Sequence, residues 1–187
     1  MLILRSGDYT IEVSNSDPPF RRGSADNVKA YDCVYCFGDS SLFTSQHTIR
    51  LQKFGQPIKS CLLSSDGGAS GIHARSAIVS RNRCIIAVGP YIAALDVPSL
   101  ELLWATQVDD ATCFGVYNSD RHDCLLFHGE LSIARVDHSG EVIWRAGGAD
   151  IFTNGFELDG DVVRATDFYN RLYVFDIETG AETTAGR

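Results

Sequence analysis

Two stretches of fourteen residues, YIAALDVPSLELLW (residues 91–104) and LSIARVDHSGEVIW (residues 131–144), follow the same plan. In each, an apolar run ends near an aspartate, a polar turn follows, and a second run closes on a tryptophan, Trp104 or Trp144. A third copy, RLYVFDIETG (residues 171–180), keeps the first run and the turn. A repeat at this spacing indicates a small supersecondary unit that is stacked on copies of itself.

The sequence around these copies consists of short β-branched and aromatic runs separated by Gly, Asn and Asp turns. Residues 76–150 contain two successive groups of such runs, and residues 151–187 contain a third group with a weak closing strand. Runs and turns at this spacing predict antiparallel meanders of four strands. No segment keeps a helical period.

The first 75 residues fit a degenerate copy of the same unit. Its expected strands are Tyr9–Val13, Tyr31–Phe37, Gln46–Phe54 and Pro57–Leu63. Leu2–Arg5 is expected to pair with the outer edge of the last sheet, because a closed ring leaves no unpaired edge.

The predicted fold is therefore all-β and β-propeller-like, with about four antiparallel blades of four strands in a small or incomplete ring. We expect a single domain over residues 1–187, with approximate blades at 1–66, 67–110, 111–150 and 151–187. If the ring does not close, the chain is either an open array of blades or closes by self-association.

The turn Asp176-Ile177-Glu178-Thr179-Gly180 and its shorter counterpart, residues 137–140, resemble the Asp-x-x-Thr-Gly turn of quinoprotein-type (PQQ-like) β-propellers. In that repeat the turn is followed by a strand that ends in tryptophan. The resemblance covers about residues 76–187 and implies the architecture. The Gly-His and Trp-Asp pairs of the related WD-repeat propellers are absent. Quinoprotein rings have about eight blades around their cofactor, so we expect no cofactor in a ring of half that size.

Charge is distributed unevenly along the chain, whose net charge is −8. Residues 1–75 carry eight Lys and Arg against seven Asp and Glu, whereas residues 76–187 carry eight Arg against seventeen Asp and Glu. An acidic surface disfavours nucleic acid and favours a basic protein partner or a cation. The alternative is a solvated surface that keeps the protein soluble.

The sequence also bears on location. No apolar run is long enough to cross a bilayer, so we expect no membrane partner. The opening residues lack the features of a secretory leader, which predicts a cytoplasmic protein if the reading frame is complete. The six cysteines are then expected as reduced thiols. Cys33 and Cys36 fall in a predicted strand, where positions i and i+3 face opposite sides and do not share a metal.

Six residues at repeated positions are the candidate binding site. Three aspartates each stand five residues before a glycine, and three further polar residues stand two positions after those glycines; in order, they are Asp66, Asp110, Asp150, His73, Tyr117 and Glu157. In a propeller these positions fall on one rim and in the channel beneath it, where they would hold a basic side chain, a cation or a polar small molecule. The alternative is that each aspartate caps a tight turn.

No catalytic signature is present: there is no nucleophile elbow, phosphate-binding loop, dinucleotide fingerprint or zinc-protease motif. His122 lies among carboxylates in residues 118–123, but this segment is expected to be an exposed hairpin turn. The sequence thus predicts a non-enzymatic protein-binding module, in its specific form an inhibitor or immunity-type protein for a basic partner. The alternative is a small-molecule or metal-binding domain that uses the aspartate-lined mouth.

Overall fold

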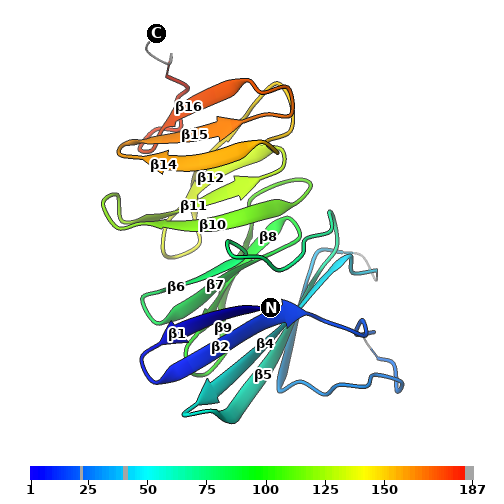
Figure 1. Ribbon diagram of the computed structural model, residues 1–187. Coiled ribbons are helices and arrows are strands. Elements are labelled where there is room, and N and C mark those ends of the chain that lie inside the picture. Colours follow the sequence, from blue (N-terminus) through cyan, green and yellow to red (C-terminus); the bar gives the residue numbers. More distant parts are fainter. Residues whose placement is uncertain (22, 40–41, 184–187) are drawn as a thin grey trace.

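Sixteen strands in four small sheets make up the part of the chain that the computed structural model describes, residues 1–21, 23–39 and 42–183, and this part contains no helix (Figure 1). The predicted all-β, propeller-like class of about four blades is therefore confirmed. The sheets follow one another in chain order, from the first at the bottom of Figure 1 to the last at the top. No helix that could span a membrane occurs among these residues.

The two middle sheets are the antiparallel meanders that the sequence predicts. The second sheet consists of β6 (Ala77–Ser80), β7 (Arg83–Val88), β8 (Tyr91–Asp96) and β9 (Leu102–Gln107), in that order. The third consists of β10 (Cys113–Ser119), β11 (Cys124–Gly129), β12 (Ser132–Val136) and β13 (Val142–Gly147). The inner strand β11 is buried along its whole length, and β7 nearly so, because a neighbouring sheet covers each face.

The first sheet differs from the expected meander. It has the order β1-β2-β4-β5-β3, with bounds β1 (Leu2–Ser6), β2 (Tyr9–Asn15), β3 (Cys33–Phe37), β4 (Ser45–Lys53) and β5 (Gln56–Ser65). The expectation that Leu2–Arg5 pairs with the last sheet is wrong, because β1 pairs antiparallel with β2. Gly7, at φ +55°, permits the tight turn between these two strands. A short local hairpin forms at a lower entropic cost than an edge contact made across the whole chain.

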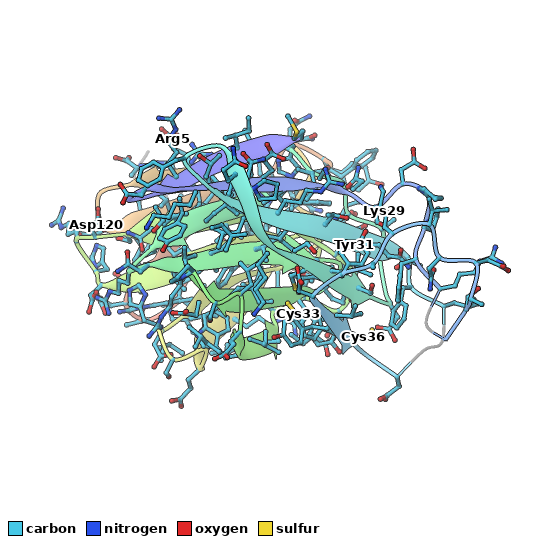
Figure 2. All side chains as sticks on the ribbon, turned by 90° about the horizontal axis from the view of Figure 1, so that it is seen from below. Arg5, Lys29, Tyr31, Cys33, Cys36 and Asp120 are labelled. Carbon is cyan, nitrogen blue, oxygen red and sulfur yellow. The ribbon has the colours of Figure 1, made fainter. Side chains whose placement is uncertain are left out.

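Strand β3 is parallel to β5, which the sequence does not predict. The segment before it crosses the outer face of the first sheet, where the Gln46 side chain accepts from Phe20 N at 2.7 Å and donates to Phe20 O at 2.8 Å. The Tyr31 hydroxyl lies 2.9 Å from Thr48 Oγ1. Figure 2 shows Lys29 and Tyr31 on this segment and Cys33 and Cys36 on β3. Because this segment crosses the sheet before β3 begins, β3 runs in the same direction as β5.

The last sheet has three strands, β14 (Gly155–Asp159), β15 (Val162–Thr166) and β16 (Leu172–Asp176). The weak fourth strand predicted here is reduced to a single bridge between Phe175 and Glu182 within the described residues. Residues 184–187, which belong to the same prediction, lie outside them.

The hydrophobic core is divided into three clusters, each between sheets that are neighbours in the chain. None of the clusters joins the last sheet to the first, so the described sheets form an open array. The two end faces carry polar side chains among apolar ones: β4 presents Gln46, Thr48 and Arg50 beside Leu62 of β5, and β15 presents Arg164 and Thr166 beside Leu172 and Val174 of β16. Terminal units with a polar outer face are what a stack of repeats needs in water.

An aromatic latch joins each sheet to the next. A side chain on the outer strand of one sheet donates a hydrogen bond to a backbone carbonyl in the last turn of the following sheet. The three latches are Tyr35 to Leu100 O at 3.4 Å, Trp104 to His138 O at 3.2 Å, and Trp144 to Ile177 O at 2.8 Å. The repeated tryptophans of the sequence therefore form contacts between successive sheets.

Candidate functional site

The first strands of the last three sheets, β6, β10 and β14, line a common groove of about 500 Å³. Its lining residues are Arg75, Ile78, Val79, Tyr117, Asn118, Phe156, Glu157 and Leu158. Consecutive residues such as Tyr117 and Asn118 point to opposite faces of a strand, yet both border this space. The groove therefore runs along the edges of the strands and not over the face of a sheet.

Hydrogen bonds between the segments that connect the sheets hold the three edges in place. Gly68 N donates to Ala111 O at 2.8 Å, which joins the connection before β6 to the connection before β10. Glu130 links the next pair, because its N–H donates to Thr112 O at 2.8 Å and its carbonyl accepts from Phe152 N at 2.7 Å. The connecting segments therefore lie along one side of the array, as expected for a propeller rim.

A stack of rings forms one wall of the groove. The guanidinium carbon of Arg75 lies 5.1 Å from the centroid of the Tyr117 ring, which stacks on Phe156 at 4.3 Å. Phe156 in turn stacks on His128 at 5.0 Å. Burial raises the pKa of the Tyr117 hydroxyl, although the positive charge of Arg75 opposes this shift. Burial lowers the pKa of His128, whose Nε2 lies 2.9 Å from Phe152 O. Both rings are therefore held neutral near pH 7.

The two charged groups of the groove have no ionic partner. Residues 75–183 contain eight arginines, six of which form ion pairs with carboxylates: Arg81, Arg121, Arg135, Arg145, Arg164 and Arg171. Arg83 donates to His138 O at 2.6 Å. Among the arginines of this described part of the chain, only Arg75 has a side chain without a hydrogen bond or ion pair, and the exposed carboxylate of Glu157 has no such partner either. The groove therefore offers one free cation and one free carboxylate beside an aromatic surface.

The six predicted residues are placed in different surroundings. Tyr117 and Glu157 line the groove, and His73 lies two residues before Arg75 with its Nδ1 accepting from Arg75 N at 3.2 Å. Asp110 forms an ion pair with Arg145 at 2.7 Å, and Asp150 accepts from the adjacent Ile151 N at 2.8 Å.

Asp66 follows β5, and its carboxylate lies against Gly38. A common mouth formed by Asp66, Asp110 and Asp150 stays a prediction. Among the described residues, no three His, Cys, Asp or Glu side chains are grouped so that they could hold a metal ion.

Sequence reasoning selected Asp110 and missed its neighbour, Asp109, which is fully buried. Asp109 Oδ1 accepts from the N–H groups of Ala111 and Thr112, at 2.7 and 3.2 Å. Its Oδ2 accepts from Leu131 N, Ser132 N and Ser132 Oγ, each at 2.9 Å. This carboxylate ties the connecting segment to β12 and so positions the start of β10. Asp109 stands next to a repeated aspartate, but the equivalent positions of the other repeats are not aspartates, so the repeat did not mark it as a candidate.

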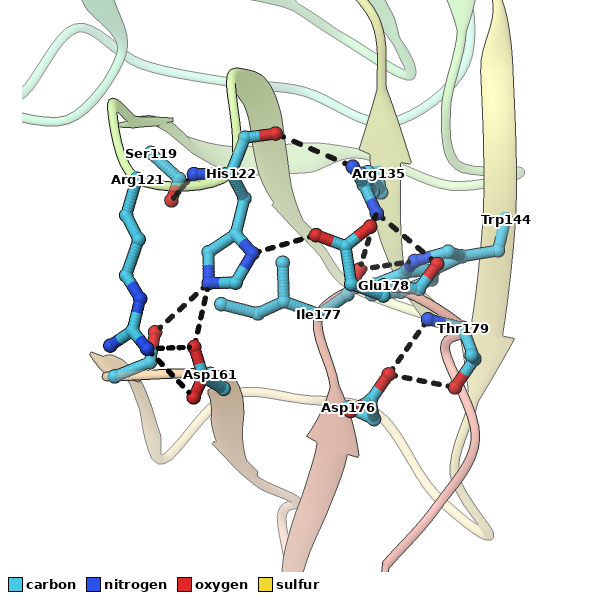
Figure 3. A network of polar contacts seen from close by, with 11 residues as sticks. Ser119, Arg121, His122, Arg135, Trp144, Asp161, Asp176, Ile177, Glu178 and Thr179 are labelled. Carbon is cyan, nitrogen blue, oxygen red and sulfur yellow. Dashed lines mark hydrogen bonds and ion pairs between the residues drawn. The ribbon is translucent and has the colours of Figure 1, made fainter.

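Arg75 was missed for a similar reason, since no repeated position marks it. His122 is also placed differently from its prediction as part of an exposed turn. Its side chain is only 9% exposed, because the last sheet covers it (Figure 3). Nδ1 lies 2.7 Å from Glu178 Oε1, and Nε2 lies 3.1 Å from Asp161 Oδ1. This network joins the hairpin ends of the last two sheets.

Comparisons with known proteins bear on the fold. No protein-family model matches the chain, and no curated protein matches it. Among solved structures, the chain is similar to the AfRom2 CNH domain, with a TM-score of 0.50 and 13% identity over 75% of this chain and 47% of that domain. It thus spans about half of the CNH domain. It is also similar to the computationally designed Ika4 protein, with a TM-score of 0.53 and 12% identity over 82% of this chain and 94% of that protein.

At these identities the similarities concern the fold alone, and they support a propeller-like architecture. The resemblance to quinoprotein-type and WD-repeat propellers stays a prediction.

Proposed function

We propose that the protein is a non-enzymatic binding module that recognises another protein through the groove between β6, β10 and β14. The observation that carries this proposal is the pair of free charges, Arg75 and Glu157, beside the Tyr117–Phe156 stack. Arginine and aromatic side chains are the groups that contribute most to protein interfaces. Stacked repeats commonly bind partners along their concave surface.

The charge of the chain favours a basic partner. The net charge is −8, and the excess of carboxylates lies in residues 76–187, which include all three groove strands. An acidic protein of this size attracts a basic partner at long range and increases the association rate. An inhibitor or immunity-type protein that neutralises a basic partner is the specific form of the proposal. All six cysteines are free thiols, which favours a reducing compartment.

The test is affinity capture from the native lysate, followed by a measured dissociation constant for the captured protein. Arg75→Ala and Glu157→Ala are expected to weaken binding at least about tenfold, since each removes a charged contact at the centre of the interface. The matched controls are Arg5→Ala and Glu141→Ala, which remove exposed charges elsewhere on the molecule. Equal binding by groove and control variants would contradict the use of the groove, and repeated capture of no protein would count against the function.

A small molecule is the second candidate ligand of the same groove, because its volume lies within the roughly 300–1,000 Å³ typical of ligand sites. The other alternative, a cation held by the aspartate-lined mouth, is tested by thermal shift with Ca²⁺ and Mg²⁺. A rise in the melting temperature that Asp110→Ala and Asp150→Ala abolish would favour the aspartate mouth over the groove.

A further inference from the structure

We infer that the groove binds an extended segment of the partner as an added strand along the free edge of β14. In this segment, basic side chains alternate with acidic or aromatic ones. The inference rests on the proposed function, because it specifies the conformation and the side-chain pattern of the partner that the groove accepts.

The edge of β14 is open to an added strand. β14 is the first strand of the last sheet, and among the described residues the only backbone hydrogen bonds of Gly155–Asp159 are those to β15. The corresponding edge of β10 is already covered, since Val116 N donates to Arg75 O at 2.8 Å and Cys113 N donates to Gly89 O at 2.7 Å. An edge strand with free N–H and C=O groups is a template for a further strand.

The groove is the space in front of this edge. It is bordered by Phe156, Glu157 and Leu158, which are consecutive and therefore project to alternate faces of the sheet. Phe156 and Leu158 pack toward the third sheet, and Glu157 projects to the opposite face. A segment that follows the edge of β14 would continue both faces, so its own side chains would alternate between the same two environments.

The two environments have opposite chemical preferences. Side chains directed toward the third sheet would meet the Tyr117 ring and the Arg75 guanidinium, which favour an aromatic or acidic residue. Side chains directed to the other face would meet Glu157, which favours lysine or arginine. Oppositely charged side chains on neighbouring strands stabilise their pairing, whereas like charges oppose it. The residue pattern of the partner follows from these contacts.

The probe is a displayed library of random eight-residue peptides, selected on the full chain and followed by binding measurements on synthetic copies of the enriched peptides. We expect enrichment of basic residues two positions apart, with acidic or aromatic residues between them. Methylation of alternate backbone nitrogens on the side that pairs with β14 is expected to weaken binding at least about tenfold, because it removes donors of the strand pairing. Methylation of the other set should have a small effect.

A charge-reversal variant tests the side-chain pattern separately. The Glu157→Lys variant is expected not to bind the peptides enriched on the wild-type chain, and selection on it is expected to enrich acidic residues in place of the basic ones. The matched control is Glu141→Lys, which makes the same change of charge outside the groove and should keep the original selection. Hydrogen exchange provides a third measurement: bound peptide should protect the amides of β14, while those of β3 should keep their rates.

The possible outcomes separate the two proposals. If peptide binding depends on Arg75 and Glu157 but is equally strong whichever set of backbone nitrogens is methylated, strand addition is overturned and the groove remains the binding site. A captured partner protein that uses the groove, together with a library that yields no binder, would have the same consequence. Binding that is insensitive to every groove variant would overturn both proposals.

Discussion

The indole N–H of Trp144 donates to Ile177 O at 2.8 Å, and its ring lies against Gly180, which follows β16 in the next sheet. Gly180 has a φ of +69°, and a Cβ at this position would lie 2.6 Å from Trp144 Cδ2. Trp104 and Gly140 repeat the arrangement at the preceding junction. The glycine of the repeated turn is therefore needed for two reasons, its backbone conformation and the approach of the indole.

Gly180→Ala tests this relationship. We expect it to lower the free energy of unfolding by about 1–3 kcal/mol, because the added methyl displaces the indole and strains the backbone. Gly7→Ala is the matched control, since Gly7 also has a positive φ, +55°, but no atom lies within 4 Å of the added Cβ. Urea denaturation measures both. An equal loss in the two variants would show that backbone strain alone accounts for the effect.

Trp144→Phe tests the hydrogen bond of the same latch. The expected loss of stability is about 1 kcal/mol, the usual net contribution of one such bond. It is limited because Ile177 O also accepts from Arg135 Nη1, at 3.2 Å. Urea denaturation again provides the measurement, and a loss several times larger would mean that the indole contributes chiefly through packing.

The neighbouring aspartates 109 and 110 are expected to differ in their contribution to stability. Asp109→Asn should cost about 2–4 kcal/mol, because the amide presents N–H donors to backbone N–H groups that are already donors. Asp110→Asn removes only an exposed ion pair with Arg145 and should cost at most about 1 kcal/mol. Thermal and urea unfolding of the two variants decide the matter. Similar losses would contradict the assignment of Asp109 as the structural residue.

Stability is expected to fall in mild acid through His47. Burial lowers the pKa of this side chain from 6.5 to about 4 in the folded protein, whereas the unfolded chain keeps an ordinary value. The unfolded state therefore binds the proton more readily between these values. The stabilisation is complete above pH 6.5 and is lost as the pH falls toward about 4, by up to about 3 kcal/mol.

His47→Gln is the variant for this prediction, because its amide nitrogen can replace Nε2, which lies 3.1 Å from Ser70 Oγ. Its unfolding free energy should change less between pH 6.5 and pH 4 than that of the wild type. His73→Gln, at an exposed histidine, is the control and should retain the wild-type dependence. An unchanged slope in His47→Gln would assign the pH dependence to other groups, of which His128 is the next to test, since burial lowers its pKa too.

The polar side chains on the end faces predict the assembly state. Arg164 and Thr166 face outward on β15, whereas the equivalent residues of β11, Leu126 and His128, are buried and covered by the next sheet. We expect the wild type to be monomeric by light scattering and the double variant Arg164→Leu, Thr166→Val to self-associate, because it exposes an apolar sheet face. Wild-type oligomers that dissociate on substitution at this face would instead support closure by self-association.

Much of the fold was accessible from the repeat. Alternating runs and turns in residues 76–150 predict the second and third sheets, and the tryptophans mark the contacts between sheets. These features depend on residues close together in the chain, which is why a single sequence records them. Tyr117 and Glu157 were found in the same way, because they occupy repeated positions on neighbouring first strands.

The rest was decided by contacts between segments far apart in the chain. No repeated pattern in the sequence marks three of these features: the pairing of β1 with β2, the parallel pairing of β3 with β5, and the burial of Asp109 in place of Asp110. The same holds for Arg75, whose side chain is distinctive only because every other arginine in residues 75–183 has a polar partner. Local patterns determine which strands form, whereas burial, strand edges and unpaired charges depend on how the sheets meet in space.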